Sequence, residues 1–155
     1  MKLSIVAVGH KLPAWMADGV AEYVKRMPSD ARIEVIELKP EDRTSKTTAK
    51  VLALEASRIE AAIPKGATRI VCDERGNMLT TKQLAQWFSG WRADGQSPCF
   101  IIGSADGLDA SLKQAATQTI ALSGCVLPHG LARVILVEQL YRAWSLMNNH
   151  PYHRD

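Results

Sequence analysis

The sequence predicts an α/β fold in which helices cover both faces of a mostly parallel sheet. Short apolar runs rich in β-branched residues alternate along the chain with longer segments whose apolar residues recur at helical spacing. Strands that alternate with helices pair in parallel, because each helix returns the chain to the same end of the sheet. No repeat, low-complexity segment or linker interrupts this alternation, so one domain spanning residues 1–155 is expected.

The first two strand and helix units lie before residue 64. Residues 3–8 form the first predicted strand, and Pro13 opens the helix that follows, because its fixed φ suits the first turn. Residues 33–38 form the second strand, and residues 47–63 have the spacing of a helix. The polar residues 39–46 between them are expected to form a mobile surface loop.

Three further units follow from capping and turn residues. Thr80 and Asp109 have side chains that cap helix N-termini, and Gly95 is typical of a residue just past a helix end. Strands are predicted at residues 69–72, 99–102 and 119–122. Helices are predicted from Thr80 to about Gly95, after Asp109, and in the C-terminal segment.

The C-terminal helix has hardly any polar side. Between residues 134 and 147 apolar side chains fall on nearly every face, whereas a helix on one sheet needs a single apolar stripe. The excess predicts a second covering, which we expect to be another subunit of a homodimer. Glu138, Arg142 and a polar tail through Arg154 accompany this apolar surface, so the pattern predicts a site where two subunits meet.

Composition limits the functional class only broadly. The chain has 155 residues, 46% of them hydrophobic, and a net charge of +3, which permits a polyanionic partner without requiring one. The apolar run at residues 3–8 is too short for a signal peptide or a membrane span, so we expect a cytoplasmic protein with no membrane partner. Cys72, Cys99 and Cys125 are odd in number and far apart, which indicates reduced thiols. His150 and His153 lack further ligands at metal-binding spacing, so no metal is expected.

Three loops that follow predicted strands are candidate ligand sites, because open parallel sheets bind ligands beyond the carboxyl ends of their strands. They are residues 72–77, 103–107 and 123–130. Their glycines allow close backbone approach to a flat ligand, although each loop alone is explained equally well by ordinary turn glycines. None matches the dinucleotide fingerprint or the phosphate loop, which disfavours a nicotinamide or a nucleoside triphosphate.

An ordered set of motifs resembles a known family along the whole chain. The motifs that carry the resemblance are Lys2-Leu3 with Val6-Ala7-Val8-Gly9, Asp73-Glu74-Arg75-Gly76, Phe100-Ile101-Ile102-Gly103 with Asp106-Gly107-Leu108, Leu127-Pro128-His129, Glu138-Gln139-Leu140-Tyr141-Arg142-Ala143 and His150-Pro151-Tyr152-His153-Arg154. By these motifs the chain is similar to the RlmH family of the SPOUT superfamily, small ribosomal RNA methyltransferases that methylate N3 of a pseudouridine in the large-subunit RNA.

The resemblance implies S-adenosyl-L-methionine as the methyl donor, a trefoil knot in the C-terminal strand and loop segments, and an obligate homodimer. By motif position, it places the adenosyl pocket at Cys72, Gly103, Leu122, Ser123, Gly124, Cys125, Val126 and Leu127. Two residues depart from the family pattern: Cys72 stands where relatives commonly have Leu, and Ser104 where they commonly have a second Gly. We expect the pocket to persist, because Cys72 still fills an apolar wall and the first glycine remains.

The expected catalytic residues are Glu138, Arg142 and His153. Methyl transfer to an imide nitrogen requires alignment of the reactants and stabilisation of a developing anion, and Arg142 is a suitable cation. His153 or a bound water would accept the imide proton. Glu138 would orient Arg142 or the substrate; the alternative is an ordinary i,i+4 ion pair worth about 0.2 to 0.5 kcal/mol.

The expected RNA-binding residues are Arg142, Tyr152, His153 and Arg154. Tyr152 offers a stacking plane, His153 a hydrogen-bonding group and Arg154 a phosphate ligand. The alternative is a frayed terminus without function. His129 is expected to structure its loop rather than carry protons.

The predicted function is therefore methylation of a pseudouridine in large-subunit ribosomal RNA, in the assembled ribosome, with no DNA partner. The alternatives are a methyltransferase of the same superfamily acting on another RNA base, and a non-enzymatic ribosome-binding factor. Binding of S-adenosylmethionine separates the last of these from the enzymes, because a binding factor needs no cofactor pocket.

Overall fold

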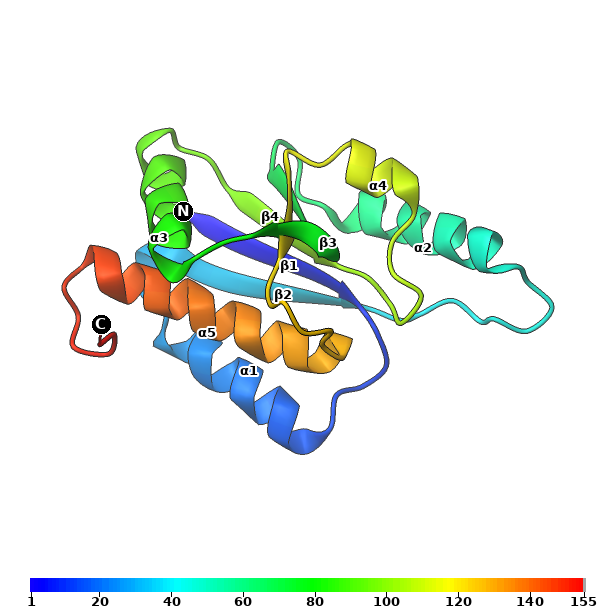
Figure 1. The fold of residues 1–155 in the computed structure, drawn as a ribbon, viewed down its shortest axis with the longest axis horizontal. Helices are drawn as coiled ribbons and strands as arrows, with labels where there is room; N and C mark the ends of the chain where they lie inside the picture. Colours follow the sequence, from blue (N-terminus) through cyan, green and yellow to red (C-terminus); the bar gives the residue numbers. More distant parts are fainter. Residues whose placement is uncertain (155) are drawn as a thin grey trace.

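The computed structural model describes residues 1–154 and contains a five-stranded sheet with helices on both faces (Figure 1). The strand order is β2-β1-β4-β3-β5, and the paired strands are parallel. The strands are β1 (Lys2–Val8), β2 (Arg32–Leu38), β3 (Thr68–Met78), β4 (Pro98–Ile102) and β5 (Gln118–Ala121). The helices are α1 (Ala14–Arg26), α2 (Thr48–Ala62), α3 (Thr81–Ala93), α4 (Ala110–Gln114) and α5 (His129–Met147), with a short 3-10 turn η1 (Ser29–Ala31). The predicted fold class is confirmed.

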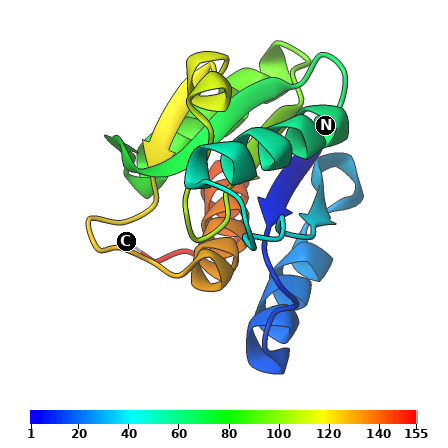
Figure 2. The same ribbon diagram turned by 90° about the vertical axis from the view of Figure 1, so that its right-hand side faces the viewer.

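Two hydrophobic clusters lie on opposite faces of the sheet. Leu3, Ile5 and Ala7 of β1 point into the cluster formed with α1, α3 and α5. The intervening residues Val6 and Val8 point into the smaller cluster formed with α2 and α4. Figure 2 shows the resulting three layers from the side. This alternation leaves β1 almost entirely buried, as a central strand of a parallel sheet requires.

The predicted caps are present where the helices begin. The Thr80 hydroxyl accepts a hydrogen bond from the Gln83 backbone N–H, and the Gln83 side chain accepts one from the Thr80 N–H, which forms a capping box for α3. The Asp109 carboxylate accepts from the Ser111 N–H at 2.9 Å and caps α4. Pro13 stands immediately before α1. These local signals fixed where the helices start.

Strand β3 is longer than the sequence predicts. Residues 73–77 were expected to form a loop, but the strand continues to Met78 and pairs with β5 again after an irregularity between Cys72 and Asn77. The continuation passes very close to β5: a Cβ atom on Gly76 would lie 2.4 Å from the backbone carbonyl carbon of Ile120. Only glycine fits there, so the motif glycine serves a chain crossing rather than a turn.

Much of the apolar surface of α5 packs against other helices of the same chain. The helix lies between α1 and α3 on one face of the sheet (Figure 1). Leu136, Val137 and Leu140 are completely buried in the larger cluster. The expected second covering is therefore supplied in large part by α1 and α3. A narrower stripe with Leu131, Ile135 and Leu146 stays half-buried.

Residues 39–46 form a surface loop, as predicted, but side chains fasten it to the rest of the molecule. Arg58 Nη1 of α2 donates to the Lys39 carbonyl oxygen at 2.7 Å. Arg43 Nε lies 2.9 Å from Asp106 Oδ2, in the turn after β4. These contacts link the loop to α2 and to the turn after β4. Across residues 1–154, no helix has the length and apolarity that a membrane span needs.

Candidate functional site

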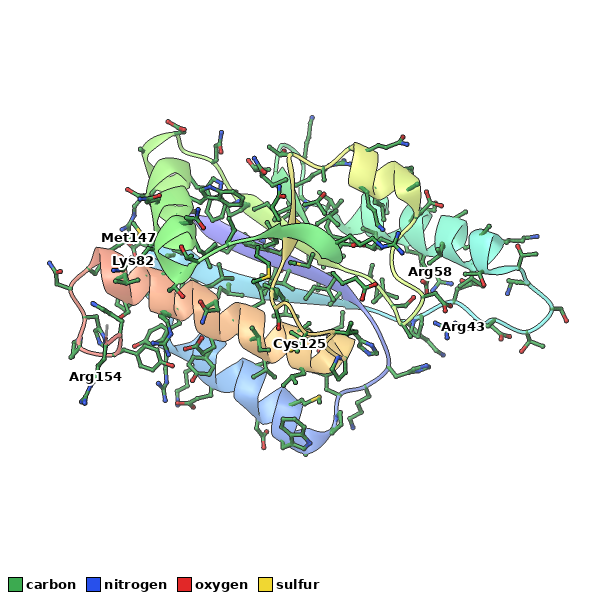
Figure 3. The ribbon with its side chains drawn as sticks, in the orientation of Figure 1. Arg43, Arg58, Lys82, Cys125, Met147 and Arg154 are labelled. Atoms are coloured by element: carbon green, nitrogen blue, oxygen red, sulfur yellow. The ribbon has the colours of Figure 1, made fainter. Side chains whose placement is uncertain are left out.

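A cavity of about 760 Å³ lies beyond the carboxyl ends of β4 and β5 and beside residues 72–75 of β3. Its size is in the range of small-molecule sites, and this edge of a parallel sheet is where such sites form. The predicted cofactor residues Cys72, Gly103, Leu122, Ser123, Cys125, Val126 and Leu127 line it, and Gly124 lies between two lining residues. Figure 3 labels Cys125 at this site, near the N-terminal end of α5.

The turn over residues 103–107 forms one wall of the cavity and requires glycine. A Cβ atom on Gly103 would lie 2.4 Å from the Gly107 carbonyl oxygen. The turn is closed by the Gly107 N–H, which donates to the Ser104 carbonyl oxygen at 2.9 Å, and Gly107 has a φ of +87°. The glycines therefore fix a tight backbone conformation at the cavity wall.

Charged groups on another wall are paired. Asp73 Oδ2 lies 2.7 Å from Lys113 Nζ, and the Asp73 carboxylate also accepts from the Arg75 N–H. Burial opposes ionisation of Asp73, but Lys113 and the Arg75 N–H outweigh it and lower the pKa of this carboxyl. Asp73 is therefore ionised at neutral pH, and its charge is paired with that of Lys113, which also lines the cavity.

Two of the three predicted catalytic residues, Glu138 and Arg142, form a second cluster along α5 with Tyr152. Arg142 Nε and Nη2 donate to Glu138 Oε1 at 2.9 and 2.6 Å, and this pairing raises the pKa of Arg142. The Tyr152 hydroxyl donates to the same carboxylate oxygen at 3.0 Å and lies 2.9 Å from the Tyr23 hydroxyl. The Arg142 guanidinium lies over the Tyr152 ring, with Arg142 Cζ 5.1 Å from the ring centroid. Glu138 thus holds both Arg142 and Tyr152.

The C-terminal tail folds back onto α5. Asn149 adopts a φ of +51°, which turns the chain, and the Ser145 hydroxyl donates to the His150 carbonyl oxygen at 3.1 Å. His153 Nδ1 lies 2.8 Å from the same hydroxyl. Arg154 is exposed at the end of the described chain. These contacts favour an ordered tail over a frayed terminus.

The cavity and the tail cluster do not meet within one chain. His129 and Ala132 bring the first turns of α5 to the cavity, whereas Arg142 lies about 15 Å further along the helix axis. Figure 3 shows Cys125 and Arg154 toward opposite ends of this helix. One chain therefore contains the predicted cofactor residues and the predicted catalytic residues at two separate places.

The sequence profile described as "Predicted SPOUT methyltransferase" matches residues 1–153. The chain belongs to the SPOUT methyltransferase family. A protein named ribosomal RNA large subunit methyltransferase H from Ralstonia pickettii (strain 12J) is 57% identical over 155 residues, with 99% of each chain covered. The protein of that name from Janthinobacterium sp. (strain Marseille) is 56% identical with the same coverage.

Two solved structures share the SPOUT methyltransferase fold. A probable methylase family protein from Haemophilus influenzae Rd KW20 matches with a TM-score of 0.54 and 11% identity, covering 99% of this chain and 70% of that one. A probable rRNA-methyltransferase from Porphyromonas gingivalis matches with a TM-score of 0.55 and 15% identity, covering 94% of this chain and 69% of that one. At these identities the likeness concerns the fold alone.

Sequence reasoning missed Arg133, a buried cation of this SPOUT methyltransferase. Its side chain on α5 is only 1% exposed, and within residues 1–154 its nitrogens have no hydrogen-bond partner. The carboxylate of Glu37 is 3.7 Å away. Burial lowers the pKa of Arg133, and burial together with this cation lowers the pKa of His129 on the cavity wall. The available signal was a cation among the apolar residues of the first turns of α5.

The three thiols differ in their surroundings. Burial raises the pKa of the Cys72 thiol, on the cavity wall, to about 12, and burial raises that of Cys99 to about 11. Cys125 is exposed on the cavity rim. The thiolate is the reactive form, so Cys72 and Cys99 are expected to be inert at neutral pH.

Brief treatment of the folded protein with iodoacetamide at pH 7.5 is expected to modify Cys125 and leave Cys72 and Cys99 intact. Peptide mass spectrometry measures the modified fraction of each thiol. A Cys125→Ser variant serves as the control, because its folded form should take up almost no label and its urea-unfolded form should label at two sites. Rapid modification of Cys72 in the folded protein would contradict the environment described for it.

Proposed function

We propose that this SPOUT methyltransferase transfers a methyl group from S-adenosyl-L-methionine to N3 of a pseudouridine in large-subunit ribosomal RNA. The observation that carries the proposal is the 760 Å³ cavity, which is lined by the residues expected to hold the cofactor. The names of the relatives that are 56–57% identical support ribosomal RNA of the large subunit as the substrate class.

The residues of the cavity suit this cofactor. Cys72, Leu122 and Leu127 would form apolar walls for the adenine, and backbone groups of the turn over residues 103–107 would satisfy its polar edge. When bound, S-adenosylmethionine supplies a methyl group attached to a positively charged sulfur.

The side chains of the second cluster would act on the RNA base. The imide of the base must lose a proton, and Arg142 would stabilise the anion that develops, because Glu138 holds its guanidinium in place. Ser145 contacts His153 Nδ1, which leaves Nε2 available to accept a proton directly or through water. Tyr152 is packed against Tyr23 and Tyr141 and would support Arg142, while the exposed Arg154 would contact phosphate.

A homodimer would unite the two parts of the site. Methyl transfer needs the donor and the activated base in contact, yet the cavity and Arg142 are about 15 Å apart along one α5 helix. A second copy that places its tail over the first copy's cavity resolves this separation. The half-buried stripe of Leu131, Ile135 and Leu146 on α5 offers apolar surface for such contact. Val126, 78% exposed at the cavity rim, would be covered in the same way.

We further propose that residues 1–155 form one domain with a trefoil knot, and that the protein acts in the cytoplasm on the assembled ribosome. Membership of the SPOUT methyltransferase family supports the knot. A single small domain has few surfaces for reading naked RNA, so shape supplied by a preassembled particle would aid recognition.

Mass spectrometry of ribosomal RNA from cells with and without the gene tests the proposal. Loss of one methyl group from a pseudouridine of the large-subunit RNA is expected, and the purified protein with S-adenosylmethionine should restore it on isolated ribosomes. Loss of a methyl group from another base would favour a different RNA substrate. No loss in any RNA, together with no binding of S-adenosylmethionine by calorimetry, would favour a ribosome-binding factor.

Deletion of residues 150–155 is expected to lower ribosome methylation at least about tenfold, which is about 1.4 kcal/mol, because it removes His153, Arg154 and the support that Tyr152 gives Arg142. Cofactor affinity should stay nearly normal, because the tail lies away from the cavity. Arg142→Ala should have the same pattern. Arg26→Ala is the matched control, because Arg26 also pairs with a glutamate one turn away and also lies over Tyr152. Full methylation by the truncated protein would remove Tyr152, His153 and Arg154 from the site.

A further inference from the structure

Glu55 is a buried carboxylate that connects two loops at the end of the sheet. It lies on α2, on the opposite face of the sheet from α5, and only 2% of it is exposed. Oε1 accepts a hydrogen bond from the Ser104 hydroxyl at 2.7 Å, and Oε2 accepts one from the Glu41 backbone N–H at 2.9 Å. Each oxygen of the carboxylate therefore has its own donor on a different loop.

One of these loops forms the cavity wall. Ser104 follows Gly103 in the turn over residues 103–107, and it is itself 8% exposed and lines the cavity. Its hydroxyl points away to Glu55, while its carbonyl oxygen closes the turn with the Gly107 N–H. The residue that departs from the family pattern is thus bound by a carboxylate that does not itself line the cavity.

The other loop, residues 39–46, also contacts the turn over residues 103–107 directly. Arg43 Nε lies 2.9 Å from Asp106 Oδ2, and Asp106 lines the cavity. Figure 3 labels Arg43 and Arg58 where this loop meets α2. The ion pair is partly exposed and screened by solvent, whereas the bonds to Glu55 lie in the protein interior. The Glu55 bonds therefore determine the position of the turn more strongly.

Burial makes the arrangement sensitive to loss of either donor. A buried carboxylate is costly unless its oxygens are hydrogen-bonded, and a buried hydroxyl or N–H without a partner is costly in the same way. The steric limit at Gly103 leaves the turn little freedom to compensate by moving. Removing Glu55 therefore releases the turn at Ser104 and the adjoining loop at Glu41.

We propose that Glu55 is a positioning residue for the cofactor cavity, where it holds the turn over residues 103–107 in its binding conformation and joins it to the loop over residues 39–46. The inference rests on the proposed function, in which this cavity binds S-adenosylmethionine. Glu55 does not line the cavity, and its effect on cofactor binding comes through Ser104 and Glu41.

Calorimetric titration with S-adenosylmethionine of the full-length protein and four variants tests the proposal. Glu55→Met removes both bonds and should raise the Kd by about fivefold to a hundredfold. Glu55→Gln should stay within about twofold of the natural protein, because its carbonyl oxygen can accept from Glu41 and its amide can donate to the Ser104 oxygen. Ser104→Ala should weaken binding, and adding it to Glu55→Met should weaken binding no further, because both changes remove the same bond.

Steady-state kinetics distinguish positioning from a general loss of folded protein. In Glu55→Met the KM for S-adenosylmethionine should rise while kcat at saturating cofactor stays near its natural value. A lower concentration of active protein would reduce kcat and leave KM unchanged, and that outcome would overturn the proposal. If Glu55→Met does not fold, Ser104→Ala replaces it, because this variant removes one hydroxyl and no charge. A raised KM for S-adenosylmethionine with unchanged kcat would then support the proposal, and a lowered kcat with unchanged KM would overturn it.

Hydrogen exchange of the protein without cofactor separates this inference from the proposed function. Amides of residues 103–107 should exchange at least about fivefold faster in Glu55→Met than in Glu55→Gln. Unchanged exchange, or a Kd for Glu55→Met within twofold of the natural value, would overturn the role of Glu55. Failure of the natural protein to bind S-adenosylmethionine would instead overturn the proposed function, with the exchange result still deciding whether Glu55 holds the turn.

Discussion

Gly103→Val is expected to abolish binding of S-adenosylmethionine, with at least about a hundredfold rise in Kd, which is about 2.7 kcal/mol. Even a Cβ atom at this position would lie 2.4 Å from the Gly107 carbonyl oxygen and 2.8 Å from Leu108 Cγ. The branched side chain must therefore displace the turn that forms the cavity wall. Overpacking of this kind also costs about 1 to 3 kcal/mol of stability, so most molecules should stay folded. Calorimetry gives the Kd, and circular dichroism gives the folded fraction.

Gly90→Val is the matched control for this variant. Gly90 lies in α3, and a Cβ atom there meets nothing within 4 Å. The same substitution should leave both cofactor affinity and secondary structure unchanged. Natural affinity in Gly103→Val would mean that the cofactor binds elsewhere, whereas equal losses in both variants would indicate a nonspecific effect of valine.

Leu140→Asp is expected to unfold most of the protein at 25 °C. Leu140 is completely buried in the cluster that α5 forms with α1, α3 and the sheet. Loss of its side chain alone costs about 2 to 5 kcal/mol, and burial of an unpaired carboxylate adds several more. Proteins of this size have about 5 to 15 kcal/mol of total stability. Urea unfolding followed by circular dichroism should show a transition shifted to very low urea or absent.

Ile135→Asp on the same helix separates the core from the proposed subunit contact. Ile135 is half-buried on the outward stripe of α5. The variant should keep its secondary structure and sediment as a monomer at concentrations where the natural protein is a dimer. A natural protein that is monomeric at micromolar concentration would contradict the proposed shared site, and a stable Leu140→Asp variant would contradict the packing of α5.

The sequence predicted those parts of the fold that depend on local signals. Thr80 and Asp109 cap helices because their side chains reach backbone N–H groups a few residues away. The course of β3 after Cys72 depends instead on β5, more than 40 residues later, against which Gly76 packs. Polar residues in this segment resembled a loop, and nothing local indicates that pairing resumes at Asn77.

In the candidate site, too, some residues could be predicted from the sequence and others depend on distant parts of the chain. The resemblance predicted the cofactor residues, and seven of those eight positions line one cavity, because residues 72–75 of β3 and the ends of β4 and β5 converge there. The covering of α5 by α1 and α3 could not be read from α5 alone, since an apolar helix surface does not reveal what packs against it. Glu55 lay in an ordinary amphipathic helix, and only its distances to Ser104 and Glu41 distinguish it.

Cys72 places a sulfur atom in the wall of a cavity that we propose for a methylating cofactor. An ionised thiol there would compete with the RNA base for the methyl group and would be permanently alkylated. Burial raises the pKa of this thiol to about 12, so almost none of it is ionised at pH 7. Burial thus protects the protein from methylating itself, which a leucine at this position would achieve by having no nucleophile at all.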